Sequence, residues 1–467
     1  MDAEKTQGEQ LKDRLFLKRD NLFKNYYEEH KTQIEEFADS YIDFMSRCKT
    51  EREVTVFAKS LFDKNGFSEF VFGKEYKPGD KIYYINKKKS VIALVVGEEP
   101  IEDGVNIIAA HIDSPRLDLK PNPLYEANEI AYFKTHYYGG IKKYQWVTIP
   151  LALHGVVALS DGSVVDVVVG EDENDPVFCI SDILPHLAYK VQNNRTTKEV
   201  IRGEELNVIL GTEPYQDEKI SEAVKLNILA ILNEKYGITE ADFVSAEFEI
   251  VPAFKARYIG FDKSLIGAYG HDDRVCAYAS FMALVREDRP KKTSVCVLAD
   301  KEEIGSEGNT GLNSDLLRNF FSLFAKTMNA NYEAVVMNSK ALSADVNAAY
   351  DPNFAEVNEK NNCCYLNKGP VLTKYTGSGG KSGTNDCSAE FVSQIRRLFD
   401  ENNIPWQTGQ LGKVDEGGGG TVAKHISYLG IDVIDIGVGL FSMHSPYEIA
   451  SRADIYAMYE SFCIFYR

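Results

Sequence analysis

The sequence predicts an α/β fold, in which helices flank a mixed sheet and an inserted, strand-rich α+β domain interrupts the chain. Short apolar runs alternate with helix-like segments in the first and last parts of the chain, whereas turn signals and alternating strands dominate the middle. Strands interleaved with helices favour a sheet covered on both faces. With 467 residues, 44% of them apolar, the chain can bury a large core. We predict one α/β domain in two parts, residues 1–118 and 253–467, around an inserted domain of residues 119–252.

The first part of the α/β domain is predicted to combine helix with buried strands. Residues 1–60 should be helical, because apolar side chains recur there at helical spacing, at Ile34, Phe37, Ala38, Tyr41, Ile42 and Met45. The run KIYYINKKKSVIALVVGEE predicts paired strands around its polar centre, INKKKS. VNIIAA at 105–110 is typical of a buried strand, and it ends at His111.

The inserted domain is predicted to contain mostly antiparallel strand. HGVVALS and SVVDVVVG flank Asp161-Gly162, a pair typical of a two-residue hairpin turn. ELNVIL and FVSAEFEIV (243–251) are also strand-like, and a helix is expected near residues 220–235 between them.

The second part of the α/β domain returns to alternating strands and helices. Three runs predict buried strands: SVCVLAD (294–300), EAVVMNS (333–339) and IDVIDIGVG (431–439). Helices are expected near 314–328 and over 448–467.

Composition and charge exclude several kinds of partner and location. Acidic residues outnumber basic ones by 70 to 52, giving a net charge of −18 that argues against binding nucleic acid or an anionic membrane. The N-terminal segment is charged throughout, without the apolar core of a signal peptide, and no apolar stretch approaches the ~20 residues of a transmembrane helix. The eight cysteines show no CxxC spacing and are expected to be reduced. We therefore expect a cytoplasmic protein.

Acidic and histidine residues gather where apolar strands give way to loops. Four loops carry them, AAHIDSP, VLADKEEIGS, LSADVNAAYDP and FSMHSPYE, with His111 and Asp113, Asp300, Glu302 and Glu303, Asp345, and His444. Ligands of open α/β sheets bind outside the carboxyl ends of the strands, so these loops could converge on one site. A further acidic segment, GHDDR (270–274), is expected to lead from a loop into a helix.

Two imidazoles and several carboxylates form a ligand set that suits zinc or another borderline divalent ion. In the Glu302-Glu303 pair, one carboxylate can bind metal while its neighbour stays free as a general base, as in metal-assisted hydrolysis. Each signal alone also has a structural explanation: adjacent glutamates are usually solvated helix surface, Asp-Asp is often a cap or turn, and a single histidine is usually structural. The order of the motifs and their placement after strands favour the metal site.

Seven motifs follow one another along residues 111–448, each occurring once: HIDSPRLDLKP, YGG (138–140), LPHLAYKVQ, GHDDRVCA, DKEEIGS, LSADVNAAYDPNF and MHSPYE. In these the sequence resembles the aspartyl aminopeptidase/aminopeptidase I family of dinuclear zinc exopeptidases, in particular its bacterial aminopeptidase I branch. The resemblance implies a zinc exopeptidase-like catalytic domain, with residues 119–252 as an inserted dimerisation domain. It also implies a metal-dependent aminopeptidase that acts on peptides with a free N-terminus.

The resemblance also implies a role for each site residue. Two metal ions would share five ligands: His111 and Asp345 on the first, Glu303 and His444 on the second, and Asp272 on both. Glu302 would be the general base, and Asp113 would orient His111. Two ions per subunit are implied, zinc above all, with manganese and cobalt as alternatives.

Further assignments concern assembly and substrate. By the same resemblance, His186 in LPHLA would reach the active site of a neighbouring subunit, against the alternative of a structural histidine, and dimers would build a tetrahedral dodecamer. Gly420 and Thr421 would lie along the substrate backbone. Lys374 could meet an acidic substrate side chain or could simply be solvated.

The sequence departs from the family pattern shortly after Asp345. Ala348 and Asp351 replace two histidines of many relatives, and the added carboxylate favours a broad or neutral preference for the first side chain over an acidic one. Two other functions stay open: a non-catalytic assembly protein, and a dinuclear deacylase with similar ligands. The intact Glu302 and the complete set of five ligands argue against the first.

Overall fold

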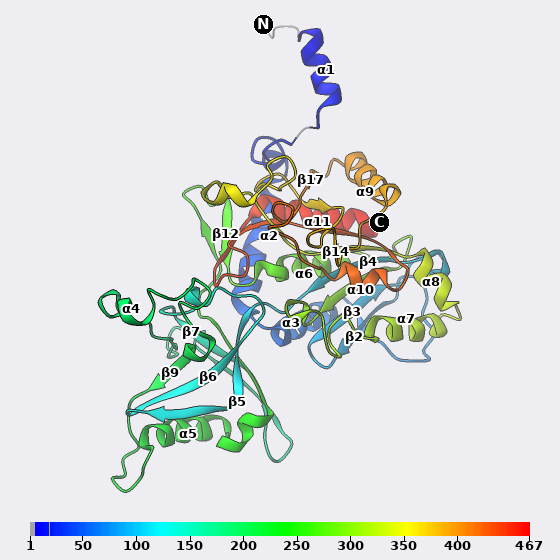
Figure 1. The fold of residues 1–467 in the computed structure, drawn as a ribbon. Coiled ribbons are helices and arrows are strands. Elements are labelled where there is room, and N and C mark those ends of the chain that lie inside the picture. The colour runs from blue at the N-terminus through cyan, green and yellow to red at the C-terminus, as the bar shows by residue number, and fades with distance from the viewer. Residues whose placement is uncertain (1–4, 18) are drawn as a thin grey trace.

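A nine-stranded sheet forms the centre of the larger domain in the computed structural model, which describes residues 5–17 and 19–467 (Figure 1). Its strands in spatial order are β1 (Ser68–Glu69), β2 (Lys81–Asn86), β3 (Ser90–Val95), β13 (Ser294–Ala299), β4 (Asn106–His111), β14 (Lys340–Ala344), β18 (Asp432–Gly437), β16 (Val371–Thr373) and β17 (Gln407–Thr408). The four strands from β13 to β18 are parallel, while β3 and β16 flank them in antiparallel orientation. The predicted α/β class with a mixed sheet is confirmed.

Helices cover both faces of this sheet. One face packs against α3 (Glu51–Lys64), α6 (His271–Leu284), α9 (Ala389–Glu401) and α11 (Arg452–Tyr466), and the other against α7 (Leu316–Thr327), α8 (Tyr332–Asn338) and α10 (Ala423–Ser427). Helix α2 (Tyr26–Arg47) packs on α6 and α11. Alternate strand residues enter the two cores, so that Ile108 and Ala110 of β4 face one layer and Ile107 and Ala109 the other. A strand buried on both faces is apolar throughout, which is why VNIIAA predicts β4 correctly.

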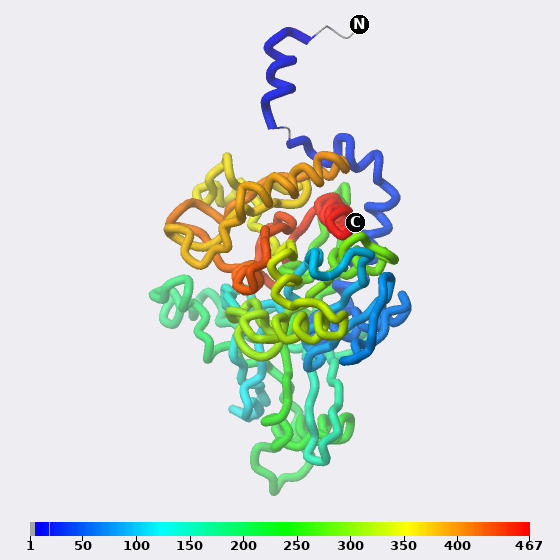
Figure 2. The backbone as a smooth tube through the Cα atoms, turned by 90° about the vertical axis from the view of Figure 1, so that its right-hand side faces the viewer, coloured from blue at the N-terminus to red at the C-terminus, as the bar shows by residue number. Residues whose placement is uncertain are grey.

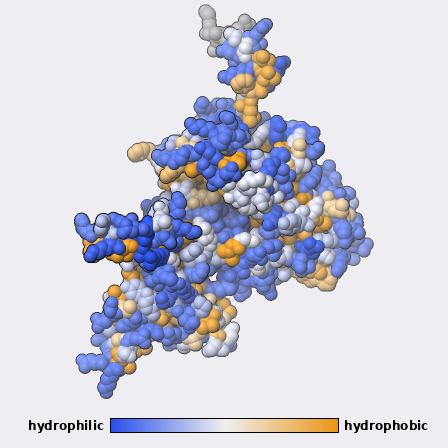
Figure 3. Space-filling view, in the orientation of Figure 1, coloured by the Kyte–Doolittle hydropathy of each residue, from blue (hydrophilic) through white to orange (hydrophobic). Residues whose placement is uncertain are grey.

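The predicted N-terminal helical region is confirmed for most of the described residues, with non-helical breaks at residues 16–17, 19–25 and 48–50. It forms α1 (Gln7–Leu15), α2 and α3, whereas residues 1–4 and 18 of that prediction lie outside the described part of the chain. Helix α1 stands apart from the body, and its apolar side chains are open to solvent together with those just after it, Leu11, Leu15, Phe16 and Leu17 (Figures 1 and 3).

The inserted segment forms a second sheet, which lies beneath the main body in Figures 1 and 2. Its antiparallel strands, in spatial order, are β8 (Val164–Val169), β7 (Leu151–Ala158), β10 (Ala246–Pro252), β5 (Arg116–Ala127), β6 (Ile130–Tyr138) and β9 (Asn207–Gly211). A separate apolar core around Trp146, Phe133 and Phe248 holds it, and α5 (Ala223–Tyr236) packs against that core. The domain boundaries at residues 119 and 252 and the dimerisation role stay predictions.

A third sheet and several short helices complete the chain. The third sheet contains, in order, β11 (Arg257–Ile259), β12 (Leu265–Ala268), β20 (Glu448–Ser451), β19 (Gly439–Phe441) and β15 (Asn347–Ala348). Helix α4 (Pro185–Val191) lies on an arm of the inserted domain. Short 3₁₀ helices occupy connections at Ile101–Asp103, Lys143–Gln145, Gly203–Glu205, Glu240–Ser245, Glu302–Ile304 and Pro352–Val357.

One predicted strand, EAVVMNS, is wrong. The segment forms helix α8, because Asn331 caps its start by accepting a hydrogen bond from the backbone N–H of Ala334. The helix then buries Val335 and Val336 in the core. Short apolar runs fit a buried strand and a buried helix equally well, and the strand β14 follows directly afterwards.

Two smaller differences concern the inserted domain. The hairpin of β7 and β8 is confirmed, but residues 159–163 form its loop in place of a two-residue turn. FVSAEFEIV becomes a strand only from Ala246, since the residues before it form a 3₁₀ helix.

Two expectations from the sequence concern membrane-spanning helices and the state of the cysteines. No helix within residues 5–17 and 19–467 is long and apolar enough to span a membrane. All eight cysteines are unpaired.

Charged side chains join the inserted sheet to helix α3 across the boundary between the domains. His154 of β7 is only 1% exposed, and its Nδ1 lies 2.7 Å from Glu53 Oε1. Its Nε2 lies 3.0 Å from Glu171 Oε1, which also accepts a hydrogen bond from Lys49 Nζ at 2.6 Å. Burial opposes protonation of His154, but the Glu171 and Glu53 carboxylates outweigh burial and raise the pKa of the ring.

We expect His154→Gln to destabilise the protein more in mild acid than in mild base. Because folding raises the pKa of His154, its charged contacts contribute fully below the ordinary value of 6.5 and are lost as the pH rises through the raised value. The free energy of unfolding, from urea denaturation, should fall by about 2 kcal/mol at about pH 6 and by less at about pH 9. His136→Gln, at an exposed position of the same sheet, is the control. An equal loss at both pH values would contradict this assignment.

Candidate metal centre

Loops from five places in the chain bring the predicted ligands to one edge of the central sheet. His111 is the last residue of β4, and Asp345 follows β14 directly. Glu303 lies in the 3₁₀ helix just after β13. Because these strands are parallel, their carboxyl ends meet at the same edge. Asp272 comes from the start of α6, and His444 from the turn between β19 and β20.

The backbone before α6 is shaped to present Asp272. Gly270 has a φ of 74°, and a Cβ there would come within 2.6 Å of Ser114 Oγ, so a glycine is required. The Asp272–Asp273 peptide bond is cis, and both residues depart from helical dihedral angles. Ser114 Oγ donates to the Asp272 carbonyl at 2.7 Å, and Asp273 Oδ2 accepts from the backbone N–H of His111 at 3.3 Å. These contacts fix the segment against the end of β4.

The ligand atoms form two groups that share Asp272. Those of His111, Asp272 and Asp345 all lie within 4.8 Å of one another, and so do those of Asp272, Glu303 and His444. Nε2 of His111 lies 3.2 Å from Asp272 Oδ1, whereas Nε2 of His444 lies 3.2 Å from Oδ2 of the same carboxylate. The two oxygens of Asp272 therefore face different groups, as a bridging ligand requires.

Asp113 ties His111 to the Glu302-Glu303 pair. The His111 ring lies with Nδ1 3.0 Å from the Asp113 carbonyl oxygen and 3.3 Å from carboxylate Oδ1. The same carboxylate accepts hydrogen bonds from the backbone N–H groups of Glu302 and Glu303, at 3.1 and 3.2 Å. With Nδ1 engaged in this way, Nε2 of His111 is left facing the ligand group.

Glu448 holds the second group, and the sequence reasoning missed it. Its carboxylate is buried and accepts hydrogen bonds from the backbone N–H of His444 at 2.7 Å and of Asp272 at 3.0 Å. Glu448 therefore fastens the main chain of two ligands at once. It belongs to the motif MHSPYE, and the available signal was an acid four residues after a candidate ligand.

The charge of these residues fits divalent cations. Burial, with repulsion from neighbouring carboxylates, raises the pKa of Glu303 and of Asp345 well above their ordinary values. Burial opposes protonation of His444, yet Asp272 and Glu303 raise the pKa of its ring to about 10. Within the described residues, Glu303 Oε1 is buried without a hydrogen-bond partner. Two imidazoles and three carboxylates, three donors to each group, fit two ions with positions left open.

Glu302 belongs to neither group of ligands, although it lies beside both. Its Oε2 is 3.9 Å from His111 Nε2, and its side chain lines the cavity. Burial raises the pKa of Glu302 to about 7. A carboxylate next to a metal group but outside it is free to exchange a proton.

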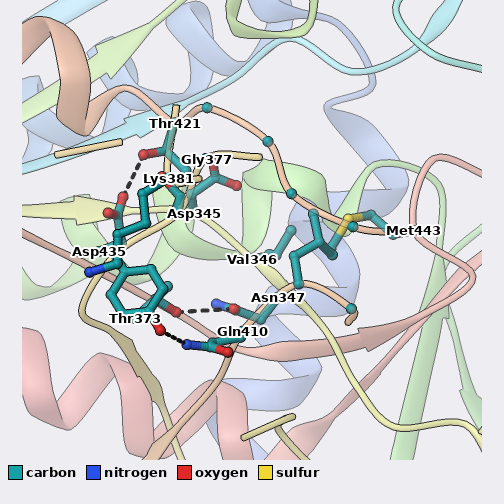
Figure 4. Close-up of a pocket in the computed structure, with 18 of the residues that line it drawn as sticks. Asp345, Val346, Asn347, Thr373, Gly377, Lys381, Gln410, Thr421, Asp435 and Met443 are labelled. Carbon is teal, nitrogen blue, oxygen red and sulfur yellow. Dashed lines mark hydrogen bonds between the residues drawn. The ribbon is translucent and has the colours of Figure 1, made fainter. Parts of the chain in front are cut away.

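A cavity of about 340 Å³ opens beside the two groups, and Figure 4 shows part of its wall. Two glycine-rich segments, residues 376–381 and 411–420, provide much of the wall. They touch through their main chains, since Gly377 N–H donates to the Gly419 carbonyl at 2.7 Å. A Cβ at Gly418 would come within 2.1 Å of the Gly377 carbonyl oxygen, so this crossing requires glycine.

The predicted substrate residues are divided between the cavity wall and its surroundings. Gly420 and Thr421 line the cavity, and Thr421 Oγ1 donates to buried Asp435 at 2.6 Å (Figure 4). Lys374 is not part of this wall as far as the described chain extends, and its Nζ lies 3.2 Å from Asp386 Oδ1. Lys381 lines the cavity instead, although Asp386 also pairs with it, at 3.0 Å.

His186 lies outside the wall of this cavity. It is exposed on helix α4, in the arm at the left of Figure 1. Several apolar side chains of the arm are open to solvent: Leu184, Leu187, Tyr189 and Val191.

Comparisons with known proteins identify the family that this chain resembles. A family model described as "Aminopeptidase I zinc metalloprotease (M18)" matches residues 44–466. A probable M18 family aminopeptidase 1 from Clostridium acetobutylicum is 49% identical over 444 residues, which cover 93% of this chain and 95% of that protein. Its counterpart from Thermotoga maritima is 45% identical over 446 residues, covering 94% of this chain and 97% of that protein.

Two solved structures extend the likeness to three dimensions. The crystal structure of an M18 family aminopeptidase from Thermotoga maritima aligns with a TM-score of 0.92 at 44% identity, covering 97% of this chain and 100% of that one. That of aminopeptidase I from Clostridium acetobutylicum gives a TM-score of 0.91 at 46% identity, with 97% and 100% covered.

Metal content should report the sharing of Asp272. We expect two divalent ions per chain in the wild type, about one in His444→Ala, and loss of both in Asp272→Ala, because only Asp272 belongs to both groups. Elemental analysis after dialysis against metal-free buffer measures this. Asp161→Ala, in the exposed β7–β8 loop, is the matched control and should keep both ions. Full metal content in Asp272→Ala would rule out the shared ligand.

Proposed function

The chain belongs to the aminopeptidase I zinc metalloprotease (M18) family and is thus a metal-dependent aminopeptidase, and we propose that it removes N-terminal residues with two metal ions and Glu302 as general base. The single observation that carries this proposal is the arrangement of two ligand groups around one Asp272 carboxylate, with Glu302 outside both.

Each residue of the centre has a defined task in this mechanism. His111, Asp345, Glu303, His444 and the shared Asp272 would hold two divalent ions, zinc in the first instance. When bound, such ions act as Lewis acids, which make water acidic and stabilise a developing oxyanion. The Glu302 carboxylate would take the proton of the attacking water and pass it to the departing amine.

The position of the cavity explains why cleavage would start at a free N-terminus. The cavity lies between the ligand groups and the two glycine-rich segments, and we propose that it admits the end of a peptide. The wall also carries carboxylates, among them Glu302, which would attract the α-ammonium group of the substrate. An N-acylated peptide lacks this positive charge.

The cavity wall supports a broad or neutral preference for the first side chain. Val346, Leu411 and Met443 supply apolar surface. Asp351, whose charge suggested this preference, instead caps the 3₁₀ helix that follows it and lies outside the described wall. Lys413, also on the wall, is the feature that would favour an acidic side chain.

The arm supports assembly with a second copy of the chain. Exposed Leu187 and Tyr189 on α4, with Leu184 just before it, offer an apolar surface that a neighbouring subunit would cover. We propose that His186, on the same helix, reaches the metal centre of the neighbouring subunit, where it would stabilise the transition state. Such dimers would form the tetrahedral dodecamer implied by the resemblance.

The wild-type enzyme should release the first residue from unblocked peptides and leave N-acetylated ones intact, and a chelator should abolish the activity. Glu302→Gln should lower kcat at least about 100-fold while metal content stays at the wild-type level, since the amide cannot accept a proton. Mass spectrometry of a peptide panel that varies only the first residue measures both activity and preference.

Each competing function predicts a different outcome in this assay. Cleavage of N-acyl amino acids, with free-amine peptides untouched, would indicate the deacylase. Inert wild type and inert Glu302→Gln in the presence of large assemblies would indicate the non-catalytic assembly protein.

His186→Ala should be inactive alone but active when co-expressed with Glu302→Gln. In a mixed dimer, the His186→Ala chain keeps its own Glu302 and receives His186 from its neighbour. With random two-fold pairing, about a quarter of the wild-type sites are restored. Steady-state rates of the purified mixture measure this recovery, and no recovery would show that His186 does not act between subunits.

A further inference from the structure

One turn of the inserted domain reaches the metal centre of its own chain. Strand β6 ends at Tyr138, and the next two residues are Gly139 and Gly140. All three residues touch groups of the centre. The mechanism described above gives them no role.

Tyr138 supports the first ligand group through Asp113. Its hydroxyl donates to Asp113 Oδ2 at 2.8 Å. Asp113 in turn lies against His111 and accepts hydrogen bonds from two backbone N–H groups, those of Glu302 and Glu303. The Tyr138 hydroxyl therefore fixes the Asp113 carboxylate. That carboxylate in turn aligns the ligand His111, the proposed base Glu302 and the second ligand Glu303.

The two glycines support the second ligand group. Gly139 has a φ of 73°, and a Cβ there would lie 3.3 Å from Glu303 Oε2. The Gly140 carbonyl oxygen lies 2.9 Å from Nδ1 of His444, so it accepts that proton and leaves Nε2 facing Asp272. A histidine ligand whose other nitrogen is held in this way has a fixed tautomer and orientation.

The turn is itself anchored in the inserted sheet. Arg116 of β5 pairs with Tyr138 across the sheet, and its guanidinium group lies 3.9 Å from the centre of the Tyr138 ring. Glu51 and Glu249, both buried, lie 3.5 and 3.3 Å from that guanidinium group. The Tyr138 ring is thus clamped on one side while its hydroxyl points to Asp113.

We propose that the Tyr138-Gly139-Gly140 turn is a positioning element, through which the inserted domain holds both metal groups and the general base in register. This inference rests on the two-metal function proposed above. None of the three residues would touch substrate or reacting atoms.

Tyr138→Phe tests the first half of the inference, because it removes only the hydroxyl. We expect about tenfold weaker metal binding in a chelator competition and about tenfold lower kcat, with KM changed less than about twofold. Tyr466→Phe is the matched control, since the buried Tyr466 likewise donates a single hydrogen bond, to the carbonyl of Val295 far from the centre. It should leave metal binding and kcat at wild-type values.

Gly140→Val tests the second half, and it stands even if Tyr138→Phe fails to fold. The Gly140 Cβ position lies 3.5 Å from Nδ1 of His444, so a methyl group is tolerated whereas the branched valine displaces the ring. We expect Gly140→Val to hold one ion about tenfold more weakly while the other is unaffected, and Gly140→Ala to resemble the wild type.

The outcomes separate this inference from the proposed function. A wild type that binds two ions and cleaves peptides, with Tyr138→Phe and Gly140→Val equal to it in metal affinity and kcat, would overturn the positioning role alone. A wild type without two bound ions would overturn the proposed function first.

Discussion

The constraint on which the rest of the structure depends is the burial of several carboxylates at one edge of the central sheet. Asp272 lies close to Glu303 in one group and to Asp345 in the other, and burial together with repulsion from neighbouring carboxylates raises the pKa of Glu303 and of Asp345. Divalent cations are the partners that relieve such repulsion, and two imidazoles complete a ligand set for them. Two further carboxylates, those of Asp113 and Glu448, accept hydrogen bonds from backbone N–H groups and so fix the loops that carry the ligands.

The backbone that carries each ligand must be held firmly at this edge, because the ligands come from five separate segments. Parallel strands deliver three of them by topology alone, since the carboxyl ends of β4, β13 and β14 meet there. Asp272 and His444 arrive on turns whose backbones lie outside ordinary helix or strand geometry. A hydrogen bond that Ser114 donates and two that Glu448 accepts hold those turns in place of sheet pairing. The residues proposed to bind metal and the residues that hold their backbones in place therefore belong to one site.

The sequence allowed the α/β class, most strands and the convergence of five ligand candidates to be predicted, because buried strands and strand-end loops leave local patterns. The strand assigned to EAVVMNS failed, since the cap at Asn331 outweighs the strand-like composition. Glu448 contacts Asp272, and Tyr138 contacts Asp113, across distances in the sequence that no local pattern marks. Only the short spacing between His444 and Glu448 left a local signal. Lys374 was a candidate by composition alone, and its pairing with Asp386 depends on how the glycine-rich loop folds.

The inserted domain connects the arm that carries α4 with the turn that lies against the metal centre. The arm that carries α4 is joined to β9 where Ile209 N–H donates to the Cys179 carbonyl at 2.9 Å. Strand β9 pairs with β6, and β6 ends in the turn at Tyr138 that contacts Asp113. Backbone hydrogen bonds therefore connect the arm through β9 and β6 to the strand that ends at Tyr138. A second subunit that covers the arm, as proposed above, would bind to the same sheet that ends beside the metal centre of this chain. On this view, assembly and catalysis share one sheet because a free arm would leave that sheet, and the ligands it supports, less firmly held.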